Sequence, residues 1–278
     1  MELFEYLFFR NALIGSFFAS IVCGIIGTYV VTRRLVFISG GITHASLGGL
    51  GAGLYLGINP IVSAVIFSVL SAFGIQWLSE RQGVREDSAI AVFWSFGMAA
   101  GIILTFLTPG YTPSLAEYLF GNILTITHVD IIALAFVTLL LSLFFVIYYR
   151  SIVSLSFDIQ FAKTRRIAVQ FISYAMMFFI AVSVVLSIRL VGIVLLMSLI
   201  TVPQMTANLF TTNYLKIIFL SAAISFVGCV VGLLMSYYLN APSGAFIILV
   251  LIIFFMFAKG IKAFSKKEKS NKIKIRNE

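Results

Sequence analysis

The fold is decided by the stretch 131-IIALAFVTLLLSLFFVIYY-149, in which Thr138, Ser142 and the two final tyrosines carry the only polar side-chain atoms. A helix needs roughly 20 apolar residues to cross the hydrocarbon core of a membrane. A strand of a lipid-facing barrel would alternate apolar with polar residues, and this stretch does not alternate. It therefore predicts a transmembrane α-helix.

Comparable apolar runs fill the rest of the chain, which is 278 residues long, 61% hydrophobic and 10% charged. A soluble domain of that length carries a more charged surface, so we predict an all-α fold, a polytopic transmembrane helical bundle. Residues 1–260 form a single transmembrane domain in this interpretation, and 261–278 form a basic tail. The predicted spans are 11–32, 36–57, 60–79, 88–107, 129–149, 167–188, 190–203, 216–238 and 244–258. Because the run at 190–203 is short, eight spans and nine spans both fit the pattern.

The basic residues predict how the bundle lies in the membrane, because cytoplasmic connections carry an excess of Lys and Arg. Placing Arg33 and Arg34 in the cytoplasm, and alternating from there, leaves only Arg10 and Arg189 outside. The basic C-terminal tail then lies in the cytoplasm, and 108–129 forms the longest exterior connection. The formal net charge of +9 fits this orientation and contact with anionic membrane lipid. We therefore expect no nucleic-acid partner.

One histidine, His44, lies inside the predicted second span, in the glycine-rich stretch 40-GGITHASLGGLGAG-53. An imidazole in hydrocarbon is costly unless it has a partner or a wet cavity, and it is a good ligand for zinc and other borderline metals. His44 is therefore either a metal-pathway residue, with Thr43, Ser46 and backbone carbonyls completing the coordination, or a structural histidine bonded to a neighbouring helix. The glycines allow another helix to approach closely, and they equally allow a wider path.

The pair His128 and Asp130 lies at the outer mouth of the predicted fifth span. It is either a solvated interfacial pair or a transient exterior metal site. None of the acidic residues falls at mid-membrane on the predicted map, although a proton-coupled or sodium-coupled carrier usually keeps a carboxylate there. Cys23 and Cys229 lie far apart inside apolar runs, and we expect buried thiols rather than a disulfide or a thiolate metal site.

The chain has no GxxxxGK[ST] phosphate-binding loop, so we expect that it does not hydrolyse ATP and is not an enzyme. An active transporter built on this chain would need its motor on another polypeptide. Pro203 is predicted to end the run that follows Arg189, since proline removes a backbone hydrogen bond. The polar stretch 204–214 then lies in the cytoplasm, either as an ordinary loop or as a short helix that contacts a soluble partner.

Three blocks, in order and over nearly the whole chain, resemble the permeases of ABC importers for zinc, manganese or iron. They are YVVTRRLVFISGGITHASLGG at 29–49, EYLFGNIL at 117–124, and the segment from SFDIQFAKTRRI to SIRLVGIVLLMSLITVPQMTAN at 156–208. The resemblance implies a homodimer in the membrane, bound to cytoplasmic ABC ATPase subunits and supplied by an extracytoplasmic metal-binding protein. It also implies that 202–213 couples to the ATPase, and the central residues of that segment are Pro203, Gln204, Met205, Thr206, Ala207 and Asn208.

The same resemblance places His44 at the metal pathway, with one departure from the family pattern. Many members carry an aspartate four residues earlier, one helical turn away, where this chain has Gly40. Losing a carboxylate oxygen disfavours manganese and favours zinc. We therefore expect a permease for a divalent metal ion, zinc or manganese, in the inner membrane of a bacterium, with no permanently bound cofactor. The alternatives are an iron or iron-chelate permease of the same architecture, and a stand-alone secondary carrier. A secondary carrier would show a mid-membrane carboxylate and inverted internal repeats, and the sequence shows neither.

Overall fold

The computed structural model describes residues 6–109, 126–239 and 242–277, and regular secondary structure within those ranges is entirely helical. The predicted all-α fold is confirmed. The helices are α1 (Leu7–Thr32), α2 (Val36–Leu56), α3 (Pro60–Gln82), α4 (Glu86–Leu107), α6 (His128–Phe157), α7 (Ile159–Thr164), α8 (Val169–Phe210), α9 (Tyr214–Leu239) and α10 (Ser243–Asn277). Most of the predicted exterior connection, including the block EYLFGNIL, lies outside the described residues.

Eight segments of the described chain are long and apolar enough to cross a membrane, and α8 contributes two of them, Val169–Ile188 and Val191–Phe210. The prediction of a polytopic helical bundle is confirmed. Helix α2 is a ninth segment of similar length, but its glycines, hydroxyl residues and histidine make it less apolar than the eight. It packs mainly on α4, and also on α3 and α8. Because neighbouring helices cover α2, it needs little apolar surface toward lipid.

Helix α8 is broken at Gly192, where φ is 74° and ψ is 169°. Glycine is the residue that adopts such a backbone conformation without strain. The prediction that Pro203 ends this segment is wrong, because the helix continues through the proline to Phe210. A membrane helix tolerates an internal proline where nearby hydroxyl groups and helices satisfy the disturbed backbone. Near the proline, the hydroxyl of Thr201 donates to the Met197 carbonyl and that of Thr206 donates to the Val202 carbonyl, each at 2.8 Å.

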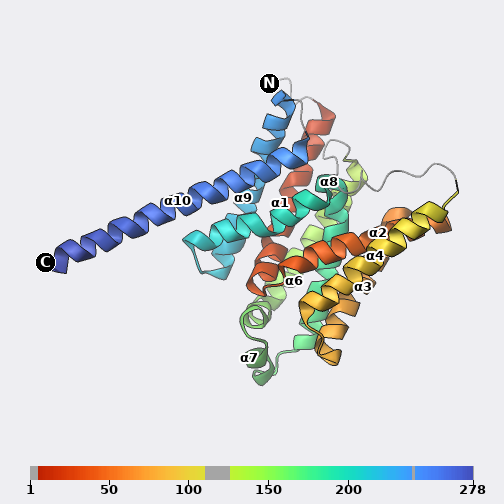
Figure 1. The fold of residues 1–278 in the computed structure, drawn as a ribbon, viewed down its shortest axis with the longest axis horizontal. Coiled ribbons are helices and arrows are strands. Elements are labelled where there is room, and N and C mark those ends of the chain that lie inside the picture. Colours follow the sequence, from red (N-terminus) through yellow and green to blue (C-terminus); the bar gives the residue numbers. More distant parts are fainter. Residues whose placement is uncertain (1–5, 110–125, 240–241, 278) are drawn as a thin grey trace.

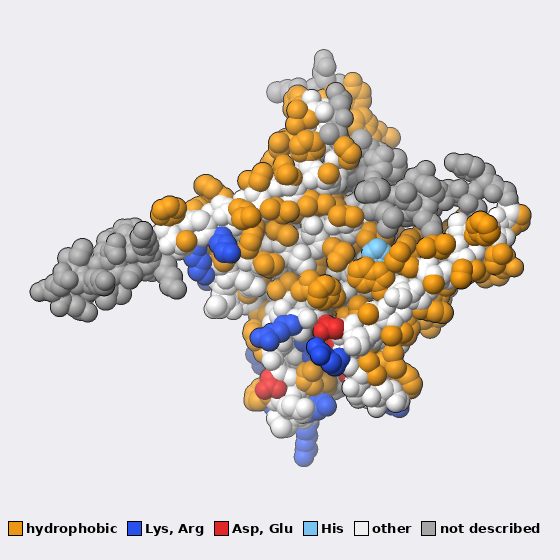
Figure 2. Space-filling view, in the orientation of Figure 1, with side chains coloured by type: hydrophobic (Ala, Val, Ile, Leu, Met, Phe, Trp, Pro, Cys, Tyr) orange, Lys and Arg blue, Asp and Glu red, His pale blue; other side chains and the backbone are white. Residues whose placement is uncertain are grey.

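The two ends of the bundle differ in chemistry. At one end, Arg33 after α1 donates to the Leu155 carbonyl near the end of α6, at 3.4 Å. At the other end, Asn11 near the start of α1 donates to the Ile126 carbonyl just before α6, at 3.3 Å. The end that holds Arg33 and α7 is named the basic end below. Figure 1 shows α7 at the bottom of the view. On the face drawn in Figure 2, most of the charged side chains gather there, and apolar side chains are spread over the rest of the described surface.

Backbone contact between α2 and α4 depends on glycine. A Cβ atom at Gly101 would lie 2.5 Å from the carbonyl oxygen of Leu47, and a Cβ atom at Gly51 would lie 2.5 Å from the carbonyl oxygen of Gly101. Real Cβ atoms do not approach that closely, so the two backbones touch where side chains would normally separate them. The glycines of α2 thus serve helix packing within one copy of the chain. Figure 1 shows α2, α3 and α4 leaning together to one side of the bundle.

Helix α10 continues without a break from its apolar part, Ser243–Phe264, to Asn277. The predicted basic tail therefore begins inside this helix, which extends away from the bundle in Figure 1. Cys23 and Cys229 are both buried and free, which confirms the expectation of buried thiols.

Candidate functional site

The imidazole of His44 lies in the middle of α2 and stacks on the indole of Trp94 from α4. The ring centroids are 4.3 Å apart and the rings are inclined by 12°. The Nδ1 atom of His44 is buried and makes no hydrogen bond to any described residue, while the residue as a whole is half-buried. A purely structural histidine would be expected to use its ring nitrogens in hydrogen bonds to a neighbouring helix. Nδ1 is therefore a buried nitrogen that has no partner among the described residues.

Thr43 and Ser46 flank His44 in sequence, and both are fully buried. The hydroxyl of Thr43 donates to the Ser39 carbonyl at 2.5 Å, and that of Ser46 donates to the Thr43 carbonyl at 2.6 Å. Both hydroxyl protons are thus committed to the backbone of α2. Their participation in a metal pathway stays a prediction, and neither is as accessible as the half-buried ring of His44.

The space beside Gly40, one turn before His44, is filled by side chains from two other helices. A Cβ atom at Gly40 would lie 2.9 Å from Cε and 3.3 Å from Sδ of Met197, which belongs to α8. It would also lie 3.3 Å from Cζ3 of Trp94. The family resemblance pointed to the missing carboxylate at Gly40, but no sequence pattern indicates that the thioether of Met197 from α8 occupies the space.

His44 does not belong to a cluster of metal-ligating side chains in the described part of the chain. No three His, Cys, Asp or Glu side chains in that part lie close enough to hold a metal ion together. The acidic residues whose side chains the structure describes lie at or near helix ends: Glu80, Glu86, Asp87, Asp130 and Asp158. A pathway past His44 would therefore hold a cation weakly, and a transported ion must be released as well as bound.

His128 and Asp130 lie in the first turn of α6, at the end opposite the basic end. The carboxylate of Asp130 accepts hydrogen bonds from the backbone N–H of Thr127 at 3.1 Å and from the Thr127 hydroxyl at 2.7 Å, and Thr127 Oγ1 accepts from the Asp130 N–H at 3.3 Å. This reciprocal capping box starts the helix. Residues two apart on a helix do not face each other, so the structure gives Asp130 a structural role and leaves the exterior metal site a prediction.

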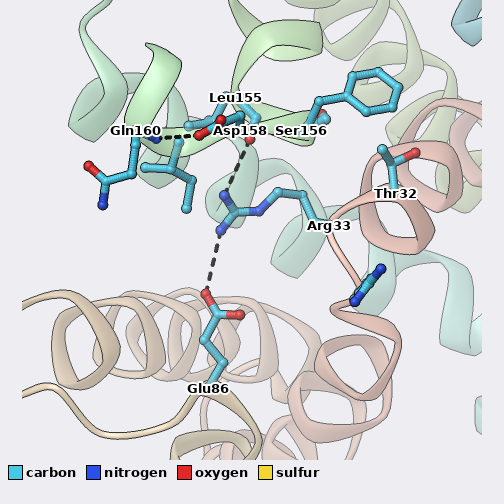
Figure 3. A pocket seen from close by; sticks show the side chains of 10 residues that line it. Thr32, Arg33, Glu86, Leu155, Ser156, Asp158 and Gln160 are labelled. Atoms are coloured by element: carbon cyan, nitrogen blue, oxygen red, sulfur yellow. Dashed lines mark hydrogen bonds and ion pairs between the residues drawn. The ribbon is translucent and has the colours of Figure 1, made fainter. Parts of the chain in front are cut away.

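A polar site that the sequence analysis missed surrounds Arg33 at the basic end (Figure 3). The Arg33 guanidinium donates to Glu86 Oε1 in the first turn of α4 and to the Leu155 carbonyl of α6, each at 3.4 Å. Its side chain is only 7% exposed, whereas that of Glu86 is 38% exposed. Arg33 thus joins the ends of α1, α4 and α6. The sequence identified Arg33 as an orientation signal, and the carboxylate at the start of α4 was the available hint of a partner.

Two cavities meet at Arg33. One, of about 610 Å³, lies between the α1–α2 turn and the link from α6 to α7, and Glu86 lines it too. The other, of about 440 Å³, reaches from Arg33 and Glu86 toward Glu80 of α3 and Gln160 of α7. Glu80 also accepts a hydrogen bond of 2.6 Å from Gln76, one turn earlier on α3. The basic end is therefore hollow around the buried Arg33, and three carboxylate residues line the two cavities: Glu80, Glu86 and Asp158.

Helix α7 is a short helix that forms the outer wall of this hollow. Asp158 caps it by accepting from the backbone N–H groups of Gln160 and Phe161, at 2.8 and 3.0 Å. Its surface is exposed: Phe161 is 49% exposed and Phe157, just before it, is 67% exposed. Exposed aromatic side chains beside charged groups are typical of a protein-binding surface.

The six residues predicted to couple to an ATPase lie on one helix, but in different surroundings. Gln204 is fully buried, and its Nε2 donates to the Cys23 carbonyl in α1 at 2.6 Å. Pro203, Thr206 and Ala207 are also buried, whereas Met205 and Asn208 are exposed. Gln204 thus lies inside the bundle and not in a cytoplasmic loop. The short link after Phe210 does reach the basic end, because Tyr214 at the start of α9 meets the Ser156 hydroxyl of α6 at 3.3 Å.

Similarity to known proteins covers nearly the whole chain. Residues 5–261 match the family described as the ABC 3 transport family. An uncharacterized membrane protein of Synechocystis is 36% identical over 90% of this chain and 89% of its own length. The manganese transport system membrane protein MntC of Listeria innocua is 31% identical over 92% of this chain and 91% of its own length.

A solved structure agrees in fold. PsaBC from Streptococcus pneumoniae in complex with Fab matches with a TM-score of 0.81 and 29% sequence identity, and the match covers 92% of each chain. The resemblance to metal-ion ABC permeases noted in the sequence is thereby confirmed. The family match includes both the helix that carries His44 and the helices that form the basic end. The chain belongs to the ABC 3 transport family.

Proposed function

We propose that this chain passes a divalent metal ion, zinc or manganese, through the membrane, and that the ion moves past His44 of α2. The observation that carries the proposal is the buried Nδ1 atom of His44, which makes no hydrogen bond to the described residues. The name of the manganese transport relative from Listeria innocua supports a metal ion as cargo. A bare ion is favoured over an iron chelate, because the glycines that would widen a path are in contact with neighbouring helices.

The free energy for transport would come from ATP hydrolysed by another chain, since this sequence has no phosphate-binding loop. We propose an assembly of two copies of this chain with ATPase subunits at the basic end and a metal-binding protein at the opposite end. The excess of Lys and Arg at the basic end supports its placement in the cytoplasm. The C-terminal part of α10 then lies in the cytoplasm, and the assembly resides in the inner membrane of a bacterium.

The ATPase would dock on the exposed part of the basic end. Helix α7 offers Phe161 beside exposed basic residues, and the guanidinium carbon of Arg165 lies 5.8 Å from the Phe161 ring centroid. The last turn of α8 offers the exposed side chain of Asn208, which is two residues before Phe210 and the link that follows it. Met205 is exposed as well, so the coupling role predicted for this segment is kept for its exposed residues and not for Gln204.

The proposed function is tested by deleting the gene in its native bacterium and measuring zinc and manganese accumulation from metal-poor medium. Accumulation of at least one of the two metals should fall, and expression of the wild-type chain should restore it. Unchanged accumulation of both metals in the deletion strain would contradict the proposal.

The orientation is tested by cysteine labelling in intact cells, in a background where Cys23 and Cys229 are replaced. Phe264 near the end of the apolar part of α10 is 79% exposed, and Val129 in the first turn of α6 is 74% exposed. A membrane-impermeant thiol reagent should label Val129→Cys and leave Phe264→Cys unlabelled until the cells are opened. The reverse pattern would invert the proposed topology.

Arg33→Gln should weaken the link between α1, α4 and α6 and impair the coupling of ATP hydrolysis to transport. The variant loses hydrogen bonds to a carboxylate and to a carbonyl, and bonds to charged groups contribute about 1.5–3 kcal/mol. The larger penalty of a fully buried pair does not apply, because Glu86 remains partly exposed. The measurements are thermal unfolding of the purified chain and metal uptake per ATP hydrolysed by the complex.

Arg85→Gln is the matched control for that prediction. Arg85 pairs with Asp87 across 3.8 Å, with the two side chains 84% and 64% exposed, and exposed pairs contribute about 0–1 kcal/mol. Equal effects of Arg33→Gln and Arg85→Gln on stability and on coupling would show that the buried position of Arg33 has no special role.

A further inference from the structure

The ligands available beside Gly40 and His44 differ in kind from a carboxylate site. Met197 of α8 brings its sulfur to 3.3 Å from the position that a Cβ atom of residue 40 would take, and Trp94 brings its ring edge to the same distance. Trp94 is also the ring on which His44 stacks. One indole thus contacts both the imidazole and the space that the thioether fills, so Met197 and His44 line neighbouring parts of one site.

Both candidate residues are partly exposed, whereas the nearby hydroxyl residues are buried. His44 and Met197 are half-buried, but Thr43 and Ser46 are fully buried and bonded to their own helix. The Trp94 Nε1–H donates to the sulfur of Met98 at 3.2 Å, which fixes the indole between His44 and the space beside Gly40. A cation at this level would therefore meet an imidazole nitrogen and a thioether sulfur, with no described carboxylate beside them.

We infer that Met197 is a specificity-determining residue of the pathway and that, together with His44, it makes this level select zinc over manganese. The inference rests on the proposed function and names the metal class for the same site. Soft thioether and imidazole ligands suit borderline and soft metals, whereas manganese prefers carboxylate, carbonyl and water oxygens. The thioether also occupies the space from which a carboxylate at position 40 would reach the ion. Met197 therefore has two effects: its sulfur is a soft ligand, and its side chain excludes a carboxylate, which is a hard ligand.

The test replaces residues in the native bacterium and compares uptake of radioactive zinc and manganese, normalised to the amount of assembled permease in the membrane. Met197→Leu keeps an apolar side chain of similar volume but removes the sulfur. It should lower the ratio of zinc to manganese uptake by at least about tenfold, because losing even a group that only supports a metal ligand typically costs that much. Met256→Leu, at a 65% exposed methionine of α10, is the control and should leave the ratio unchanged.

A second variant tests the same inference by gain of function. Gly40→Asp combined with Met197→Ala supplies a carboxylate and removes the thioether that would collide with it. This double variant should raise manganese uptake relative to zinc. Because it gains an activity, its result does not depend on whether Met197→Leu assembles poorly.

The outcomes separate the inference from the proposed function. If the wild-type chain takes up both metals, and their ratio is unchanged in Met197→Leu and in the double variant, the role of Met197 is wrong and the permease function stands. A wild-type chain that takes up manganese in preference to zinc also overturns the inference alone. If the wild-type chain moves neither metal, the proposed function fails and the inference fails with it.

Discussion

Metal uptake should fall to the background of the deletion strain when His44 is replaced by phenylalanine. The variant keeps an aromatic ring that stacks on Trp94, as the imidazole does at a centroid distance of 4.3 Å, but it has no nitrogen to bind a metal. An aromatic pair of this kind contributes about 0.5–1.5 kcal/mol, so His44→Phe should retain most of the stability. The Nδ1 atom makes no hydrogen bond to a described residue, and none is lost at that atom. Uptake is measured with radioactive zinc and manganese.

His44→Asn completes that experiment, because asparagine keeps a hydrogen-bonding group and is a poor ligand for a borderline metal. Uptake should fail in this variant too. A stably assembled His44→Asn or His44→Phe variant that takes up either metal at nearly the wild-type rate would make His44 a structural residue.

Gly101→Leu should remove most of the assembled protein from the membrane. Its side chain would begin 2.5 Å from the Leu47 carbonyl oxygen, and that neighbour is backbone, which cannot rotate away. Overpacking a well-packed interior costs typically about 1–3 kcal/mol and sometimes more, and here two helices must separate along their whole contact. The amount of folded protein is measured by size-exclusion chromatography after detergent extraction.

Gly260→Leu provides the control for helix propensity and added bulk. A Cβ atom at Gly260, in α10, would meet nothing within 4 Å, and leucine favours a helix over glycine by up to about 1 kcal/mol. Gly260→Leu should therefore assemble as well as the wild type. Comparable yields of folded Gly101→Leu and Gly260→Leu would show that α2 and α4 do not need their close backbone contact.

The helices were predictable because apolar length is a direct physical requirement of the membrane. The predicted spans lie within helices of the structure, except that residues 57 and 167–168 fall just outside them. Pro203 is the exception to this predictability. Proline usually breaks a helix because it lacks a backbone N–H, yet α8 continues through Pro203. Packing decides that outcome, since Gln204 beside the proline is held by the Cys23 carbonyl of α1. Because Cys23 and Gln204 are 181 positions apart, no local sequence pattern predicts their contact.

The candidate site was predictable only in part, for the same reason. The position of His44 inside a glycine-rich helix could be predicted from the hydropathy and the residue types of the sequence. Its neighbours Trp94 and Met197 come from α4 and α8, and apolar residues in apolar runs give no indication of which of them meet. The ion pair of Arg33 with Glu86 joins residues 53 positions apart. Both charges were read from the sequence, and only the fold brings them together.

The central claim is that metal crosses the membrane through this chain, driven by ATP that another chain hydrolyses. The most direct measurement is zinc and manganese accumulation in liposomes that contain this chain and its ATPase subunits, with and without ATP on the ATPase side. The account predicts accumulation only when both chains and ATP are present, and none with this chain alone. Accumulation by this chain alone under a proton or sodium gradient would contradict it, because the chain would then be a secondary carrier.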